Sequence, residues 1–549
     1  MLTKADIFPY KHDKKYAKAV AYFSMEFAID QSLKIYSGGL GFLAGSHMRS
    51  AYEMKQNLVG IGLLWKYGYY DQVRDMNGNM KVEYTRKYYS FLKDTGIVFP
   101  VEVHSAVVHV KAFLLRPETF GSAPLFLLST DIEQNDAISR TITNRLYDAN
   151  ESTRVAQSIV LGIGGAKLLE LLDMKMDYYH MNEGHALPLA FYLHDKLGSL
   201  EKVREKLVFT THTPEKAGNE ERDIFLLEKM SFFYHLSKEE FKEIWAVEGD
   251  AVNYTLCALR AARISNAVSK MHGDVSREMW SGYDNICEIT YITNAQNKKY
   301  WKDEILEKAL EKNDNPSLLT RKSAMKKELF DIVADQSGKL FDPEVMTLVW
   351  ARRFAGYKRA NLLTKDADRF EKLLNNTKYP IQIIWAGKPY PEDYGAIDIF
   401  NQLFWLTLPY PNATVLTGYE LQLSAKLKKG SDVWLNNPRI TREASGTSGM
   451  TAAMNGSINF SIPDGWIPEF AQHGKNAFLI KPAPDTLSYD EQNDLEATRL
   501  LDMLEHEILP MYYENKIKWA SIVKEGMKTV APAFDSDRMA DEYYKKMFV

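Results

Sequence analysis

The sequence predicts an α/β fold built from two lobes. Short apolar runs typical of buried strands alternate with helical stretches, and in the second half of the chain this alternation implies a parallel sheet. Two glycine-rich turns follow predicted strands, and several other strands end in polar residues. A highly charged helical stretch at 298–335 indicates a solvated bridge, so we place the boundary between the lobes near residue 295.

Three segments follow from this pattern. Residues 1–295 are expected to form the first lobe with a β-rich insertion, and residues 296–525 the second lobe. The insertion is expected at 57–70 and 98–130, where short runs with partial alternation predict an antiparallel hairpin or small sheet. Residues 526–549 are expected to form a C-terminal helix that packs back on the first lobe.

Composition argues against several classes of protein. With 45% hydrophobic and 26% charged residues, the 549-residue chain is typical of a globular protein with a large core. A net charge of −4 gives no basic excess for nucleic acid, and two cysteines without a CxxC motif argue against a disulfide framework or zinc ribbon. No apolar run approaches the ~18–20 residues needed to cross a bilayer, and the N-terminus lacks a signal-peptide pattern. We therefore expect a cytoplasmic enzyme without a membrane or nucleic-acid partner.

A glycine turn follows the first predicted strand, at 19–27. Gly38, Gly39 and Gly41 make this turn, and a helical pattern from Phe42 to Met54 follows it. A strand, a glycine turn and a helix in this order are typical of phosphate-binding α/β units. The turn lacks the GxGxxG pattern, so a dinucleotide is not indicated, and a packing role for these glycines stays open.

Three later strands of the first lobe deliver polar side chains at their carboxyl ends. Glu183 and His185 follow one strand, His212 follows the next, and Asn294 ends a third. Ligands of open α/β sheets bind at this edge, so the three strand ends predict one shared crevice. A metal site would need a third ligand that is not evident nearby, and a simple turn cluster is the alternative.

The second lobe carries a basic cluster after its first predicted strand, at 345–349. Arg352, Arg353, Lys358 and Arg359 lie within eight residues. Arginine suits bidentate binding of phosphate, so the cluster predicts an anion site. A solvated charged face is the alternative, but we favour the anion site because the cluster follows a buried strand.

A second glycine-rich turn follows the predicted strand at 432–435. The run 443–450 begins with Glu443 and is dominated by small residues, and helix-compatible residues 451–454 follow it. Backbone N–H groups of such a turn suit a phosphate, and Glu443 suits hydrogen bonds from sugar hydroxyls. An ordinary strand–turn–helix unit is the alternative.

Together these motifs resemble the α-glucan phosphorylase family (glycogen, starch and maltodextrin phosphorylases), and most closely its short bacterial and archaeal members. The resemblance covers most of the chain and rests on YSGGLGFLAG (36–45), HMNEGH (180–185), FTTHTP (209–214), ITN (292–294), ARRFAGYKRA (351–360), WAGKPYPEDYG (385–395) and DVWLNNPRITREASGTSGM (432–450). It implies a GT-B fold, in which two Rossmann-like lobes face each other across a cleft. It also implies a retaining reaction in which inorganic phosphate cleaves the terminal α-1,4-glucosyl unit and releases glucose 1-phosphate.

The resemblance also implies roles for individual residues. The catalytic positions are His212, Arg353, Lys358 and Glu443. The positions at the substrate or cofactor phosphate are Gly38, Gly39, Gly41, Arg352, Thr447, Ser448 and Gly449. The sugar-binding positions are His185, Glu183, Asn294, Ser445 and Gly446. No metal is implied.

One departure from the family concerns its cofactor. The family attaches pyridoxal phosphate to a lysine directly after the EASGT run, and the residue at that position here is Thr451. A hydroxyl cannot form a Schiff base, and Lys428 and Lys429 are not aligned to replace the lysine. We therefore expect no covalent cofactor, and pyridoxal phosphate only in non-covalent form.

Three functions stay open at this point. We favour a retaining α-glucan glucosyltransferase of phosphorylase type, acting on an α-glucan or maltodextrin with phosphate or a sugar phosphate. Related retaining enzymes that use sugar nucleotides also have a non-lysine residue eight positions after the glutamate, as Thr451 is here. A non-catalytic glucan-binding paralogue is the third reading. Family members are often dimers, so the resemblance allows a homodimer.

Overall fold

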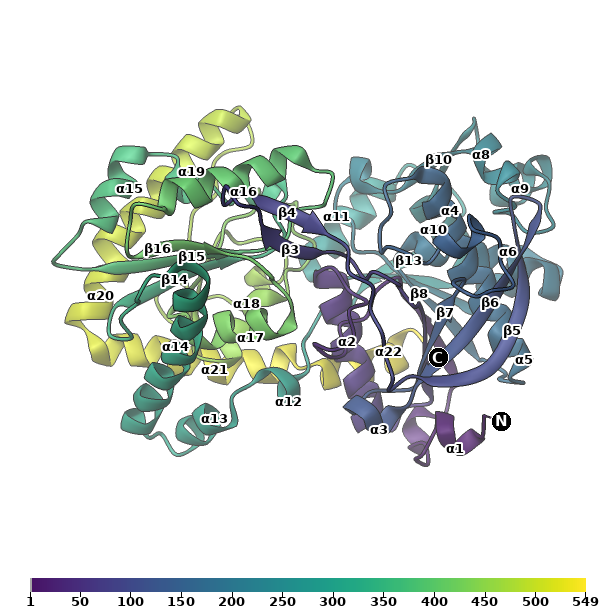
Figure 1. Cartoon of the computed structure of the whole chain (residues 1–549), viewed down its shortest axis with the longest axis horizontal. Helices are drawn as coiled ribbons and strands as arrows, with labels where there is room; N and C mark the ends of the chain where they lie inside the picture. The colour runs from purple at the N-terminus through teal and green to yellow at the C-terminus, as the bar shows by residue number, and fades with distance from the viewer. Residues whose placement is uncertain (1) are drawn as a thin grey trace. The chain divides into compact units, whose positions relative to one another are not determined.

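The computed structural model describes residues 2–549, which fold into two compact units (Figure 1). Unit 1 contains residues 2–70, 84–297 and 536–549, and unit 2 contains residues 71–83 and 298–535. This division differs from the expected boundaries in two places. Residues 71–83 lie in unit 2 although they interrupt the first lobe in sequence, and the last segment of unit 1 begins at Ser536 rather than at 526.

Unit 1 is built on a mixed sheet that has nine strands within residues 2–549, in the order β13-β12-β9-β8-β1-β2-β7-β6-β5. The strands are β1 (Val20–Phe23), β2 (Leu58–Leu63), β5 (Lys93–Val103), β6 (Ala106–Leu115), β7 (Leu125–Ser129), β8 (Tyr178–Asn182), β9 (Leu207–Thr210), β12 (Ile264–Ala267) and β13 (Glu288–Tyr291). Neighbours from β13 to β7 are parallel, whereas β6 and β5 are antiparallel. The strand order reverses between β1 and β8, so their carboxyl ends form a topological switch point, where open α/β sheets bind ligands.

Strand β2 corrects the predicted insertion at 57–70. Its sequence LVGIGL is buried at every position, and it pairs in parallel with β1 and β7. A continuous apolar run is what a central parallel strand needs, because both of its faces are covered. The prediction of an antiparallel insertion was therefore wrong for this segment, whereas β5 and β6 do form an antiparallel pair that continues to β7.

The remaining elements of unit 1 are mostly helices. They are α1 (Lys4–Ile7), α2 (Gly39–Glu53), α3 (Pro117–Phe120), α4 (Glu151–Ile159), α5 (Gly165–Leu171), α6 (Pro188–Leu197), α7 (Leu200–Arg204), α8 (Ile224–Lys229), α9 (Lys238–Trp245), α10 (Tyr254–Ala261), α11 (Lys270–Trp280) and α22 (Ser536–Lys546), with a small hairpin of β10 (Glu221–Asp223) and β11 (Ala251–Asn253). Helix α22 packs against α2, where the Oγ atoms of Ser536 and Ser50 lie 2.6 Å apart. The ring of Tyr543 stacks on His47 at 5.1 Å, so α22 belongs to the core of unit 1.

Unit 2 is built on a parallel sheet of six strands in the described chain, in the order β16-β15-β14-β17-β18-β19. The strands are β14 (Met346–Ala351), β15 (Ile381–Ala386), β16 (Ala413–Leu416), β17 (Val433–Asn436), β18 (Ile458–Ser461) and β19 (Ala477–Leu479). Numbered along the chain, this is the order 3-2-1-4-5-6 of a Rossmann sheet, and its switch point lies between β14 and β17. The prediction of an α/β fold with a parallel sheet in the second half is confirmed.

Helices of unit 2 alternate with its strands. They are α12 (Lys298–Trp301), α13 (Glu304–Glu311), α14 (Asn315–Ser337), α15 (Ala367–Leu374), α16 (Tyr394–Thr407), α17 (Leu421–Gly430), α18 (Ser448–Met454), α19 (Tyr489–Met503), α20 (Leu509–Glu514) and α21 (Lys516–Phe534). The antiparallel hairpin of β3 (Asp71–Arg74) and β4 (Met80–Glu83) lies beside α16, as the dark ribbon next to the green helix in Figure 1 shows. Within residues 2–549, no helix combines the length and apolar character needed to span a bilayer.

Candidate functional site

The switch point of unit 1 holds His212 in one orientation. Asn182, the last residue of β8, donates from Nδ2 to Ser24 Oγ at 3.1 Å and presents Oδ1 to His212 Nε2 at 2.7 Å. Since Ser24 Oγ itself donates to a carbonyl oxygen, the amide orientation of Asn182 is fixed, and His212 Nε2 carries the proton. Burial lowers the pKa of His212 to about 3, so its imidazole is neutral at physiological pH.

Glu183 follows Asn182 and contacts His212 directly. Its Oε2 accepts the backbone N–H of His212 at 2.8 Å, and burial raises the pKa of the Glu183 carboxyl group to about 7. The backbone of Glu183 has φ 72° and ψ 169°, a conformation that costs a residue other than glycine ~1–3 kcal/mol. Strain of this kind persists only where the surroundings enforce it, and here it points the carboxylate toward the loop after β9.

Two predicted sugar-binding residues keep a buried polar atom without a protein partner. Among the described residues, His185 Nδ1 and Asn294 Oδ1 are buried and make no hydrogen bond. His185 lies in a short turn, Gly184–Ala186, after β8, and Asn294 lies beyond β13. A buried polar atom without a partner is costly, so both atoms are suited to form hydrogen bonds with a ligand.

The glycine turn of unit 1 is arranged differently from the prediction. The carboxylate of Glu26 accepts the N–H groups of Ser37 at 2.6 Å and Gly38 at 3.1 Å, and it also binds Tyr147 Oη at 2.8 Å. A Cβ atom on Gly41 would lie 2.7 Å from Glu26 Oε2, so Gly41 is needed for packing. An internal carboxylate thus takes the Gly38 amide that we predicted for phosphate. Helix α2 begins at Gly39, and its first-turn amides lack intrahelical acceptors.

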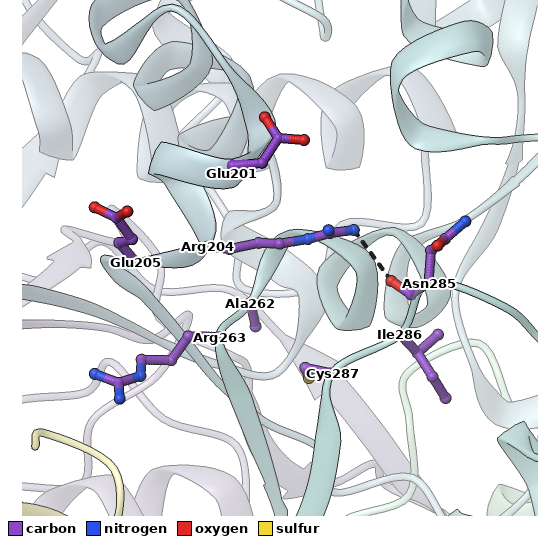
Figure 2. Close-up of a pocket in the computed structure, with 8 residues that line it drawn as sticks. All are labelled: Glu201, Arg204, Glu205, Ala262, Arg263, Asn285, Ile286 and Cys287. Carbon is purple, nitrogen blue, oxygen red and sulfur yellow. Dashed lines mark hydrogen bonds between the residues drawn. The ribbon is translucent and has the colours of Figure 1, made fainter.

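A surface pocket of unit 1 lies apart from these residues. Its volume is about 530 Å³, and Figure 2 shows the residues that line it: Glu201, Arg204, Glu205, Ala262, Arg263, Asn285, Ile286 and Cys287. Arg204 donates to the carbonyl oxygens of Arg260 at 2.6 Å and Asn285 at 3.1 Å, and Arg263 donates to Tyr178 Oη at 3.1 Å. Both guanidinium groups therefore already donate hydrogen bonds to protein oxygens. None of the predicted site residues lines the pocket.

The switch point of unit 2 brings three predicted residues into contact. Lys358 Nζ lies 2.5 Å from Glu443 Oε2, and an Arg352 guanidinium nitrogen lies 3.4 Å from the same oxygen. Arg352 follows β14 and Glu443 follows β17, so the adjacent ends of these strands create the cluster. We call Arg352, Arg353, Lys358 and Glu443 the cation cluster, because its cations outnumber its single carboxylate.

Electrostatics keep the Glu443 carboxyl group ionised. Burial alone would raise its pKa, but the charges of Lys358 and Arg352 hold the pKa below its ordinary value. Arg353 also contributes to this field. Arg352 and Lys358 are buried beside Glu443, whereas Arg353 is exposed. Buried cations that outnumber the carboxylate are favourable for a phosphate group.

Asp464 and Trp466, which the sequence analysis did not select, hold the backbone of Glu443 and Ser445; we call these two contacts the clamp. Asp464, after β18, accepts the N–H of Glu443 at 2.9 Å, and Trp466 N–H donates to the Ser445 carbonyl oxygen at 3.1 Å. Gly465 between them has φ +60°, and a Cβ atom there would lie 2.2 Å from the Ser445 carbonyl oxygen. Burial raises the pKa of Asp464 to about 7. The same rule of polar residues at strand ends would have selected Asp464.

The loop between Glu443 and α18 combines open and packed positions. Ser445 Oγ is buried without a protein partner among the described residues, so it is available to a ligand. Gly446 has φ +84°, and Thr447 is nearly buried. Ser448 Oγ accepts the Trp434 Nε1–H at 3.3 Å, and a Cβ atom on Gly449 would lie 2.3 Å from Asn459 Oδ1. Ser448 and Gly449 therefore also serve the packing of α18.

Thr451 stands at the position where the family resemblance places the cofactor lysine. Thr451 is fully buried in α18, and its hydroxyl donates to the Ser448 carbonyl oxygen at 3.0 Å. Lys428 is also buried, and its Nζ lies 3.9 Å from the centre of the Trp301 ring. The residue at this position offers a hydroxyl in place of an amine, and a hydroxyl does not form an imine with an aldehyde.

Comparison with known proteins places the chain among the phosphorylases. No family model matches it. It is 34% identical to maltodextrin phosphorylase of Thermococcus litoralis over 97% of this chain and 71% of that protein. The chain belongs to the α-glucan phosphorylase family. This phosphorylase-family protein is also 30% identical to glycogen phosphorylase of Aquifex aeolicus, over 98% of its own length and 87% of the relative. A further relative, an uncharacterized protein of Methanocaldococcus jannaschii, is 47% identical over 97% of this chain and all of its own length.

The fold of the phosphorylase-family protein agrees with this assignment. Its two α/β units, with switch points between β1 and β8 and between β14 and β17, have the strand orders that a GT-B glycosyltransferase combines. The predicted GT-B class and the predicted glycosyltransferase family are therefore confirmed.

Proposed function

We propose that this protein is a retaining α-glucan glucosyltransferase of phosphorylase type that works without covalent pyridoxal phosphate. Its reaction is α-1,4-glucan plus phosphate in equilibrium with glucose 1-phosphate and a shortened glucan. The observation that carries the proposal is the contact of Lys358 and Arg352 with Glu443 at the switch point of unit 2, in a chain whose cofactor position is Thr451.

The cation cluster would bind the phosphate group. Negative charge on the phosphate oxygens changes as the glycosidic bond loosens, and fixed cations in a buried site stabilise that charge without reorganising. Lys358 and Arg352 are both buried, so little water competes with them. When phosphate enters, we expect Lys358 to divide its hydrogen bonds between Glu443 and the ligand, because an ammonium group has three donors.

The residues of unit 1 would bind the glucosyl unit. His212 is neutral and fixed by Asn182 and Glu183, so its loop is preorganised for a hydroxyl-rich ligand. Asn294 Oδ1 and His185 Nδ1 have no protein partner among the described residues, and a sugar hydroxyl can both donate and accept hydrogen bonds. These roles agree with the assignment of His212 as a catalytic residue and of Asn294 and His185 as sugar-binding residues.

The cofactor and partner assignments are part of the proposal. Thr451 supports a protein without an imine-linked cofactor, and any pyridoxal phosphate would bind non-covalently. The substrates would be an α-glucan or maltodextrin and phosphate, or glucose 1-phosphate in the reverse direction. The family resemblance allows a homodimer.

A donor panel tests the proposal. Purified protein is incubated with maltodextrin and inorganic phosphate, and separately with sugar nucleotides, while glucose 1-phosphate and released nucleotide are measured. Phosphate-dependent release of glucose 1-phosphate without added cofactor is expected. Turnover only with a sugar nucleotide would replace the proposal with a sugar-nucleotide-dependent glucosyltransferase, and glucan binding without turnover would replace it with a non-catalytic paralogue.

A further inference from the structure

The hairpin β3–β4 is the one segment of unit 2 that comes from the middle of unit 1 in sequence. The chain leaves unit 1 after Tyr70, forms the hairpin, and returns to unit 1 at Tyr84. Its two strands pair with Gln72 opposite Val82 and Arg74 opposite Met80. Both ends of the hairpin are thus covalently continuous with unit 1, while its side chains contact the sheet of unit 2.

Gln72 joins two loops at the carboxyl edge of that sheet. Its Nε2 donates to the Gly387 carbonyl oxygen at 2.9 Å, and its Oε1 accepts the N–H of Gly418 at 3.0 Å. Gly387 follows β15 and Gly418 lies two residues beyond β16. The side chain is 6% exposed, so both hydrogen bonds are shielded from water and losing them would leave buried groups unpaired.

Gly387 connects Gln72 to the cation cluster, because its backbone packs against that of Arg352. Its φ is +153°, and a Cβ atom there would lie 1.8 Å from the Arg352 carbonyl oxygen. The N–H of Arg352 in turn donates to the Ala386 carbonyl oxygen at 3.1 Å. The backbones of Gly387 and Arg352 are therefore in tight contact, and a shift of one displaces the other because packed interiors have little free space.

Arg74 keeps the hairpin in place for this role. Its guanidinium donates to the Val415 carbonyl oxygen at 2.7 Å and lies 3.9 Å from the centre of the Phe404 ring. Met80 N–H donates to Asn401 Oδ1 at 2.8 Å, and Trp405 Nε1–H donates to Asn79 Oδ1 at 3.0 Å. These contacts fix the hairpin to α16 and β16, so the Gln72 amide reaches the two loops from a rigid base.

We propose that Gln72 is a positioning residue for phosphate binding, acting through Gly387 on Arg352. The inference rests on the proposed function, because it assumes that the cation cluster binds phosphate. Loss of the Gln72 amide lets the loop after β15 move, and the Arg352 backbone follows it. The predicted consequence is selective: phosphate binding weakens, whereas glucan binding does not change.

The test compares two hairpin variants with the full-length wild-type protein. Gln72→Leu keeps the size of the side chain and removes both hydrogen bonds. Lys81→Met removes only the exposed ion pair between Lys81 and Glu83 within the hairpin. We expect Gln72→Leu to raise the KM for phosphate about tenfold and the KM for maltodextrin less than about twofold, since small displacements of binding groups carry large penalties. Lys81→Met should leave both constants unchanged, because exposed ion pairs contribute little.

A second readout separates this inference from the proposed function. Inorganic phosphate alone should raise the melting temperature of the wild-type protein, and it should do so less in Gln72→Leu. No phosphate response in the wild type would count against the proposed function. A wild-type response with an equal response and equal KM in Gln72→Leu would overturn the role of Gln72. If Gln72→Leu does not fold, Gln72→Asn, whose shorter amide cannot span both loops, is compared on the same criteria.

Discussion

Replacing Lys358 by methionine tests the electrostatics of the cation cluster. The change removes the ammonium 2.5 Å from Glu443 and leaves that carboxylate with Arg352 at 3.4 Å. Both side chains of the Lys358–Glu443 pair are nearly buried, at 11% and 13% exposure. Breaking a buried pair by removing one partner costs about 3–5 kcal/mol, because the remaining charge is desolvated. Loss of one charge-stabilising donor should also lower turnover about 10²–10³-fold.

The stability loss should depend on pH. In the wild type the pKa of Glu443 lies below its ordinary value, so its contribution to stability is complete above that ordinary value and is lost only at lower pH. In Lys358→Met burial dominates and raises the pKa of Glu443, so the carboxyl group takes up a proton in mildly acidic solution. Urea unfolding should therefore show a larger loss at about pH 8 than at about pH 5.

Two further variants make the result decisive. Lys358→Met/Glu443→Gln removes both charges and should recover most of the lost stability but none of the lost turnover. Lys365→Met is the matched control, because Lys365 pairs with Asp494 on the surface and such pairs contribute ~0–1 kcal/mol. A stability loss in Lys358→Met that equals the control and does not change with pH would exclude a stabilising buried pair between Lys358 and Glu443.

Three other predictions concern groups around the two switch points. Asp464→Asn should destabilise the protein by about 1–3 kcal/mol and lower kcat, because the single amide oxygen cannot replace the two carboxylate oxygens that accept the backbone N–H groups of Glu443 and Gly465. Urea unfolding and initial rates measure these two effects. Unchanged values would contradict a role of Asp464 in holding Glu443. The pKa of Glu183 is raised to about 7, so the folded state holds its proton more tightly and the unfolding free energy should fall as pH rises from about 4.5 to about 7. Glu183→Gln should reduce that slope, and an unchanged slope would exclude Glu183 as its source. Asn294→Ala should raise the KM for maltodextrin about tenfold with little effect on melting, because Oδ1 has no partner within residues 2–549. An unchanged KM would argue against contact between Asn294 and the sugar.

The sequence could predict those parts of the fold that depend on local pattern. Polar residues after buried strands located His212 and Arg352, and the structure places both just after a strand and near a switch point. The rule works because parallel strands share one carboxyl edge. The assignment of residues 57–70 to an antiparallel insertion was wrong, because an apolar run without periodicity does not distinguish a central parallel strand from an insertion.

Contacts between residues distant in sequence could not be predicted in this way. Glu26 takes the Gly38 amide, which we predicted to bind phosphate, and nothing in the glycine motif reveals that an internal carboxylate satisfies it. The docking of Gln72 on Gly387 joins residues separated by 315 positions. Asp464 was within reach of the strand-end rule, and its role in holding Glu443 shows that the rule should be applied to every strand of the sheet.

The most direct test of the central claim is phosphorus NMR of protein with maltodextrin and inorganic phosphate, after treatment to remove any bound aldehyde cofactor. We expect a growing signal of α-glucose 1-phosphate from protein whose mass, after borohydride reduction, equals that of the polypeptide alone. A mass increase corresponding to bound pyridoxal phosphate, or a signal that appears only when this cofactor is added back, would contradict it.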